Sequence, residues 1–265
     1  DGEFIELDFE GFILEFTVAV IKDSLRRFTS SYSTRHLRQV FPYLHETRDA
    51  YGVAASLLKL QHHFYLNEQH KTELANLLKS PLLILPAASQ GHAMCFIRFH
   101  QWWAKIDRGE NSLKEGSINI YRMTRPEVID VNFLQEFLYK KQSRNYFHQM
   151  INQKLGLMPI AQIPISSQIS GNCSWANIQA AIPVAFALQR LYETNEVPVK
   201  EAIELYHTIV EWDKDRALDE CIHRFYVANH LRKASIASML GAVLFQACNY
   251  EHAHHVERAE KILSI

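Results

Sequence analysis

The sequence is poor in glycine and proline, and it lacks paired cysteines and long apolar runs. Its 265 residues include nine Gly and eight Pro, which disfavours an all-β or linker-rich chain. The four cysteines stand far apart without a C-x-x-C pair, so we expect neither a disulfide framework nor a zinc ribbon. Free thiols fit a reducing compartment. Because no stretch of about 18 apolar residues is present, we expect no transmembrane helix.

A dominant charge sign is also missing. Lys and Arg number 28 and Asp and Glu 29, giving a net charge of −1, so no basic field points to nucleic acid. The chain has no P-loop, no dinucleotide-binding glycine fingerprint and no H-E-x-x-H motif. His252 and His255 would share a helix face, but without a Cys or acidic partner at a known metal-ligand spacing we interpret them as solvated surface. We therefore expect no cofactor, no metal and no nucleic-acid partner.

Hydrophobic residues make up 48% of the sequence, which is enough to form a hydrophobic core. Residues 1–80 place their apolar side chains at helical spacing and are predicted to form an N-terminal helical block. Residues 81–195 begin with short apolar runs bounded by turn residues and are predicted to form the core domain. Residues 196–265 again have helical spacing and form a C-terminal block. The predicted strands are 82–86, 93–99, 102–107, 117–123 and 158–165; predicted helices include about 34–45, 50–64, 199–212 and 217–231.

These segments predict an α+β fold. We expect a small, mainly antiparallel sheet, with the helix that follows Cys173 packed on it. The N- and C-terminal helical blocks would flank this core.

Cys173 stands where a polar turn meets a helix. The stretch from Gln168 to Ala176 has the sequence Q-I-S-G-N-C-S-W-A, and an apolar helical run follows that Pro183 should kink or restart. The first N–H groups of a helix have no internal partner and the dipole there is positive, so a thiolate is stabilised and nucleophilic near neutral pH. Gln168 is the candidate donor to an oxyanion that forms beside the sulfur. Taken alone, a cysteine at a helix start is more often a small buried residue.

A cysteine nucleophile needs an imidazole within hydrogen-bond reach and a polar group that holds the imidazole. His92 follows Gly91 at the start of a predicted strand, and Asp107 ends the next strand. If the two strands pair about a turn at residues 100–101, the two side chains come out nearly opposite one another. Asp107 is therefore the candidate orienter of the His92 ring.

Each of these assignments has an alternative. Glu110 or Asn111 could take the orienter role in place of Asp107. On its own, His92 is more often a satisfied structural histidine, and Asp107 a turn residue that accepts backbone N–H bonds. The joint order of the candidates favours catalysis. The predicted set consists of the nucleophile Cys173, the base His92, the orienter Asp107 and the oxyanion donor Gln168.

The same residues carry a family resemblance. The stretch from Gln168 to Ala176 resembles the cysteine-helix motif of papain-like peptidases, and Gly91-His92-Ala93 resembles their histidine strand. The order His, Asp, Gln, Cys is that of the adenain and SUMO-protease-like clan, which includes deubiquitinases and acetyltransferase effectors injected by bacteria. Gly-His-Ala, Asp-Arg-Gly and Gly-Asn-Cys-x-Trp-Ala together resemble effectors of intracellular bacteria, some of which carry ankyrin repeats. The resemblance covers residues 81–193; where the SUMO-protease branch has Trp after its histidine, this chain has Ala93.

The resemblance implies a virulence effector that a bacterium secretes into the host cytosol, where it acts on a ubiquitin-like or other host protein. The leading prediction is a cysteine-dependent acyl hydrolase, a peptidase or isopeptidase, in which Cys173 attacks a carbonyl and His92 carries the proton. Two alternatives stay open. The same residues could pass an acetyl group to a host protein, and Lys140-Lys141 with Arg144 would then bind a phosphorylated activator. Alternatively, the helices of 199–263 lead into a repeat array, and the protein is a non-catalytic interaction module.

Overall fold

The computed structural model describes residues 9–63, 66–89, 92–109, 116–167, 173–247 and 253–265. It divides into two compact units, Asp1–Tyr206 and His207–Ile265. The first unit holds a sheet with its surrounding helices, and the second unit is helical. Helix α9 (Val199–Val227) begins in the first unit and continues into the second.

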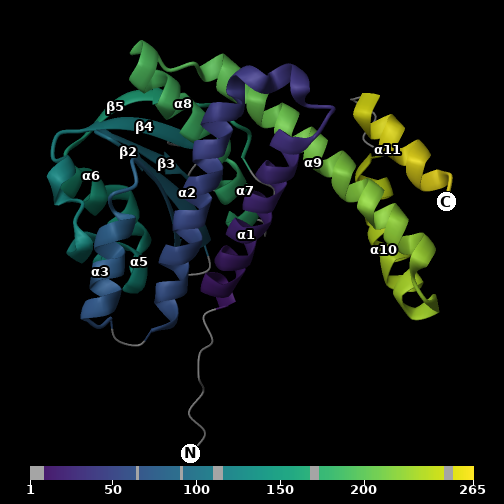
Figure 1. Ribbon diagram of the computed structural model, residues 1–265, viewed down its shortest axis with the longest axis horizontal. Helices are drawn as coiled ribbons and strands as arrows, with labels where there is room; N and C mark the ends of the chain where they lie inside the picture. The colour runs from purple at the N-terminus through teal and green to yellow at the C-terminus, as the bar shows by residue number, and fades with distance from the viewer. Residues whose placement is uncertain (1–8, 64–65, 90–91, 110–115, 168–172, 248–252) are drawn as a thin grey trace, which may run out of the picture. The chain divides into compact units, whose positions relative to one another are not determined.

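Within the described residues, five strands form one antiparallel sheet in the order β1-β2-β3-β4-β5 (Figure 1). The strands are β1 (Leu82–Ser89), β2 (His92–Phe99), β3 (Trp102–Ile106), β4 (Ile118–Met123) and β5 (Leu157–Gln162). The β2–β3 hairpin turns at His100, whose φ is 51°. Pro86 lies inside β1 rather than at its end, which is tolerated because β1 is an edge strand. The predicted α+β fold with a small antiparallel sheet is confirmed.

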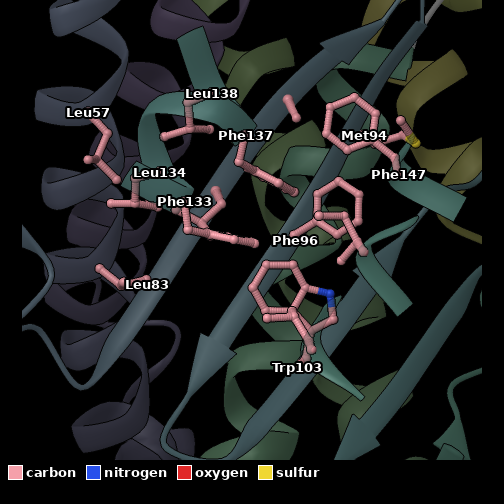
Figure 2. Close-up of a cluster of buried hydrophobic side chains, with 14 of the residues drawn as sticks. Leu57, Leu83, Met94, Phe96, Trp103, Phe133, Leu134, Phe137, Leu138 and Phe147 are labelled. Carbon is pink, nitrogen blue, oxygen red and sulfur yellow. The ribbon is translucent and has the colours of Figure 1, made fainter. Parts of the chain in front are cut away.

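An aromatic core closes one face of the sheet (Figure 2). Alternate side chains of β2 and β3, among them Phe96 and Trp103, belong to this core. The ring of Phe96 lies 5.1 Å from that of Phe137 and 5.5 Å from that of Phe147, measured between centroids. Elements that contribute to the core include α3 (Glu68–Leu77), η3 (Pro126–Val128), α5 (Val131–Tyr139), the π-helix η4 (Tyr146–Met150) and α6 (Ile151–Leu155). The large buried rings fix β2 and β3, whose ends carry the candidate site.

The cysteine helix packs on the same two-strand region. α7 (Cys173–Gln179) and α8 (Ala181–Thr194) both contact β2, and Tyr192 of α8 packs edge-on against Phe99. α8 begins two residues before Pro183, so the predicted restart of the helix is confirmed. The hydroxyl of Tyr51 donates to the Ile178 carbonyl of α7 at 2.6 Å and ties this helix to the N-terminal part of the chain.

The N-terminal helices contact each other and the edge of the sheet at β1. They are α1 (Phe9–Ser30), η1 (Arg35–Val40), α2 (Phe41–Lys59) and η2 (Leu60–His62). The prediction of two helices between residues 34 and 64 is wrong, because the single helix α2 spans the expected break. At that break, buried Thr47 donates to the Tyr43 carbonyl at 2.8 Å and accepts from Gln189 at 3.3 Å. The bond within the helix and the tertiary bond from Gln189 together keep α2 continuous through this polar stretch.

The second unit consists of the later part of α9 with α10 (His230–Ala247) and α11 (Ala253–Leu263). The prediction of two helices over α9 is also wrong. Arg216 pairs with Asp213 one turn away at 2.8 Å, within the expected break. Buried Arg258 of α11 pairs with Glu211 and Asp215 of α9, each at 2.7 Å, and joins the two helices. Across the described ranges, no helix is both long and apolar enough to cross a membrane.

Candidate active site

Three chain segments meet at the start of β2, and each contributes one predicted site residue. His92 is the first residue of β2, Asp107 directly follows β3, and Cys173 is the first residue of α7. The structure thus brings three of the predicted residues together, and the prediction that Cys173 begins a helix is confirmed. The other predicted residues lie outside the described part of the chain: Gln168, Glu110 and Asn111.

The β2–β3 register explains why His92 and Asp107 meet. Cys95 pairs with Ile106, and the same register continued by three residues puts Gly109 opposite His92. Asp107 is then two residues away and on the same side of the sheet. His92 Nε2 lies 2.8 Å from Asp107 Oδ1, and the Gly109 N–H donates to the same oxygen at 3.0 Å. Because Nε2 faces Asp107, Nδ1 is the ring nitrogen left for the thiol.

Gly109 is required by the close approach of the histidine ring. A Cβ at this position would lie 2.7 Å from His92 Cε1 and 3.2 Å from Asp107 Oδ1. In the described chain the glycines with positive φ are Gly116 and Gly156, so at Gly109 the requirement is for space and not for a special backbone conformation.

Cys173 is half-buried, and β2 contacts its sulfur. The backbone N–H of Ala93 donates to Sγ at 3.4 Å. The hydrogen bond with His92 lowers the pKa of the Cys173 thiol against the opposing effect of burial, and the N–H groups of Ala93 and Ser174 lower it further. Cys95, inside β2, differs: burial raises the pKa of its thiol, as in inert core cysteines. The surroundings of Cys173, unlike those of Cys95, favour the thiolate.

The charges of the three side chains support one another. The hydrogen bonds with Asp107 and then with Cys173 raise the pKa of His92 to about 9. Burial alone would raise the pKa of Asp107, but the hydrogen bonds and charge of His92 and the Gly109 N–H lower it overall. Because the imidazole pKa rises while the thiol pKa falls, the two shifts together favour an imidazolium–thiolate pair over the neutral pair.

Asn177, which our sequence reading missed, holds α7 against the strand ends. It lies one turn after Cys173 and is fully buried. Its Nδ2 donates to the Ala93 carbonyl at 2.7 Å, and its Oδ1 accepts from the Arg108 N–H at 2.8 Å. Ala93 follows His92 and Arg108 follows the carboxylate residue, so one side chain fixes all three segments. The signal was present in the sequence as a polar Asn four residues after the cysteine, one helical turn on and just before the apolar run of residues 180–188.

Arg108 extends this anchoring. Its buried guanidinium donates to the Ser166 carbonyl at 2.9 Å and to the Tyr206 hydroxyl at 2.8 Å. It also lies over the Tyr206 ring, 5.7 Å from the centroid. The middle residue of the Asp-Arg-Gly motif is therefore structural, while its neighbours contact the histidine.

A second histidine lies behind Asp107. His148, in the middle of η4, places Nε2 3.5 Å from Asp107 Oδ2. Lys105, two residues before Asp107, places Nζ 3.0 Å from His148 Nδ1. The two-residue period of a strand predicts that Lys105 and Asp107 share a face, whereas nothing local in the sequence signals His148.

Within the described ranges, no group of three or more His, Cys, Asp or Glu side chains could hold a metal ion.

Fold and site together define an α+β protein with a cysteine, a histidine and an aspartate assembled where strand ends meet a helix start. Among solved structures, the chain is similar to the Legionella effector AnkH, with 68% sequence identity and a TM-score of 0.90. The match covers 99% of this chain and 56% of that chain, so this chain spans just over half the length of that effector. Neither protein-family models nor curated proteins give a match. The similarity supports a bacterial effector, and it carries no information about hydrolysis.

Proposed function

We propose that this protein is a bacterial effector whose first unit is a cysteine-dependent acyl hydrolase, a peptidase or isopeptidase acting on a host protein. The effector part rests on the similarity to the Legionella effector AnkH. The hydrolase part rests on one observation. His92 Nε2 lies 2.8 Å from Asp107 Oδ1, and the N–H of the next residue, Ala93, donates to Cys173 Sγ at 3.4 Å, so base, orienter and nucleophile meet at one end of β2.

In the acylation step, the Cys173 thiolate attacks a carbonyl carbon, and the C–S bond forms as the carbonyl π electrons move to oxygen. When the tetrahedral intermediate collapses, the bond to the leaving nitrogen breaks. His92 gives its Nδ1 proton to that nitrogen, and a thioester remains on Cys173. Asp107 holds the ring through Nε2, so that Nδ1 keeps facing the sulfur throughout.

In the deacylation step, neutral His92 takes a proton from water while the water oxygen attacks the thioester. The C–S bond breaks, the acid leaves, and the thiolate and imidazolium are restored. The Cys173 backbone N–H, at the start of α7, would stabilise the oxyanion of both steps, with the Gln168 amide as the second donor.

The proposed substrate is a host protein, met in the host cytosol after secretion. The SUMO-protease branch, whose histidine is followed by Trp, accepts the tail of a ubiquitin-like protein. Here the small residue Ala93 follows His92 and donates its N–H to the sulfur. Because this chain has Ala93 in place of that Trp, the substrate panel described below tests ubiquitin-like tails and ordinary peptide bonds separately.

The test is a substrate panel of fluorogenic peptides and of ubiquitin-like proteins that carry a C-terminal fluorophore or electrophile. We expect turnover or covalent labelling that Cys173→Ala abolishes without lowering the melting temperature. Cys221→Ala is the matched control, because it removes a half-buried cysteine of α9 and should leave activity unchanged. Activity that survives in Cys173→Ala would end the proposal.

The same thioester can be intercepted by a hydroxyl or amine of a host protein instead of water, which would make the protein an acyltransferase. Labelled acetyl-CoA separates the two reactions. Label that reaches Cys173 and then a host Ser, Thr or Lys would replace hydrolysis by transfer. If neither labelling nor turnover is observed, and host proteins are retained by the purified chain, the protein is a non-catalytic interaction module.

A further inference from the structure

The two carboxylate oxygens of Asp107 have different contacts. Oδ1 accepts from His92 and from the Gly109 N–H, whereas Oδ2 has no hydrogen-bond partner among the described residues. His148 Nε2 lies 3.5 Å from Oδ2, slightly beyond a normal hydrogen bond. On the far side of the His148 ring, Lys105 Nζ lies 3.0 Å from Nδ1. A line of polar groups therefore runs from Lys105 through His148 and Asp107 to His92.

This line is shielded from water. Lys105 is 3% exposed as a residue, and the side chains of His148 and Asp107 are 11% and 3% exposed. A buried lysine is costly unless its charge and its donors meet partners. Lys105 lies two residues before Asp107, so both side chains point to the same side of the sheet, where Lys105 reaches the His148 ring.

The chemistry of Lys105 determines which nitrogen of His148 carries the proton. A lysine ammonium has only donors, so the His148 nitrogen that faces it must accept, and this nitrogen is Nδ1. A neutral imidazole with an accepting Nδ1 carries its hydrogen on Nε2. That N–H faces Asp107 Oδ2, the oxygen that otherwise has no described donor.

We propose that Lys105 and His148 are positioning residues of this site, with Lys105 holding His148 in the tautomer whose Nε2–H faces Asp107. The tautomer rests on geometry alone. Its effect on turnover rests on the proposed function.

The pair has a defined task in the reaction. When His92 gives its proton to the leaving group, Asp107 loses its cationic neighbour. The Nε2–H of His148 and the charge of Lys105 then keep the Asp107 carboxylate ionised and fixed. Within the described ranges, ionisable groups that face this region include His92 from β2, Lys105 from β3, His148 from η4 and Cys173 from α7.

η4 explains how His148 is held. The segment is a π-helix, a rare form that occurs frequently at functional sites. Tyr146 and Phe147 anchor it in the aromatic core, and the Phe147 ring stacks on Phe96 at 5.5 Å. His148 therefore extends toward Asp107 from a segment whose neighbouring residues are packed in the core.

Three variants separate positioning from mere packing. His148→Gln keeps the polarity of the proposed tautomer, since its amide can accept from Lys105 and donate to Asp107. His148→Leu removes both bonds, and Lys105→Met removes the group that fixes the tautomer. Lys154→Met is the matched control: it deletes the ion pair between Lys154 of α6 and Glu136 of α5 and the lysine above the Tyr146 ring, but it leaves Lys105, His148 and Asp107 in place.

The direct readout is ¹⁵N NMR of the histidine side chains, with His148 assigned from the His148→Gln spectrum. We expect wild-type His148 to have a protonated Nε2 and an unprotonated Nδ1. Lys105→Met should move the ring away from that state, and Lys154→Met should not. A protonated Nδ1 in the wild type overturns the proposal.

The functional readout is the rate of Cys173 alkylation across pH, which needs no substrate. His148→Leu should lower the neutral-pH rate roughly tenfold, and His148→Gln should restore it. Lys105→Met should lower the rate in the wild-type background but have little effect beside His148→Gln, because an amide has no tautomer to lose. Equal effects of Lys105→Met in both backgrounds would refute the role assigned to Lys105.

The two readouts distinguish this inference from the proposed function. If His148 has the expected tautomer but no substrate is turned over, the hydrolase is refuted and the positioning pair stands. If turnover depends on Cys173 and His148→Leu leaves the alkylation profile unchanged, the hydrolase stands and the positioning pair is refuted.

Discussion

Gly109→Ala adds one methyl group at the tightest point of the site. Its Cβ would lie 2.7 Å from His92 Cε1, where ordinary contacts begin at 3.4 Å. The imidazole is a side-chain group that can rotate, so we expect it to give way by the difference, roughly 0.7 Å. The backbone at Gly109 accepts alanine, because its φ is not in the left-handed region.

The size of the His92 displacement determines how far the alkylation rate should fall. A movement of that size would stretch the 2.8 Å contact between His92 Nε2 and Asp107 Oδ1 to about 3.5 Å, beyond a normal hydrogen bond. Misplacement of a catalytic group by about 1 Å costs on the order of a hundredfold in rate, so we expect Cys173 alkylation at neutral pH to fall by about 10- to 100-fold. Stability should fall by only about 1–2 kcal/mol, because the lost charge-assisted bond is partly offset by the stiffer unfolded chain.

The assay is the rate of Cys173 alkylation by iodoacetamide, followed by mass spectrometry, with urea denaturation of the same samples. Gly241→Ala is the matched control, because a Cβ there meets nothing within 4 Å and the residue lies in α10. It should leave the alkylation rate unchanged and gain up to about 1 kcal/mol of helix propensity. A wild-type alkylation rate in Gly109→Ala would refute the packing argument for His92.

Four further outcomes follow from the same contacts. Asn177→Leu leaves a buried carbonyl and a buried N–H unpaired and should cost about 3 kcal/mol in urea denaturation; a cost under about 1 kcal/mol would contradict its anchoring role. Asp107→Asn removes the main cause of the raised His92 pKa, so the alkaline limit of imidazolium-dependent alkylation should fall from about 9 toward 6.5, and an unmoved limit would argue against the pair. The folded state favours protonated His92, so the contribution of His92 to the free energy of unfolding is complete below pH 6.5 and is lost as the pH rises through about 9. The free energy of unfolding should therefore fall with pH across this window in the wild type, and this fall should be absent in His92→Ala. Arg258→Met removes the buried partner that Asp215 and Glu211 of α9 share, although Glu211 keeps its ion pair with Lys214, and it should destabilise the second unit by about 2 kcal/mol, which differential scanning calorimetry would detect as an earlier transition.

The meeting of His92, Asp107 and Cys173 could be predicted from the sequence because each lies at the end of a strongly patterned element. A tight turn at His100 fixes the β2–β3 register, and a fixed register decides which side chains share a face. A polar, Gly-containing sequence before an apolar run predicts a helix start near Cys173, the first residue of α7. The catalytic roles of these residues stay predictions.

The rest of the site depends on contacts between segments that have no sequence pattern in common. His148 lies 41 residues after Asp107 and reaches it only because η4 packs on the aromatic core. The errors in the helices have the same origin. Polar stretches at Thr47 and near Asp213 look like breaks, but tertiary contacts and local ion pairs keep α2 and α9 continuous.

The most direct test of the central claim is the pH dependence of Cys173 alkylation in the wild type and in His92→Ala. An assembled pair predicts a thiolate that reacts well below the free-cysteine pKa of about 8.5 in the wild type and loses this reactivity in the variant. Slow alkylation with an ordinary cysteine pKa in both proteins would contradict the claim.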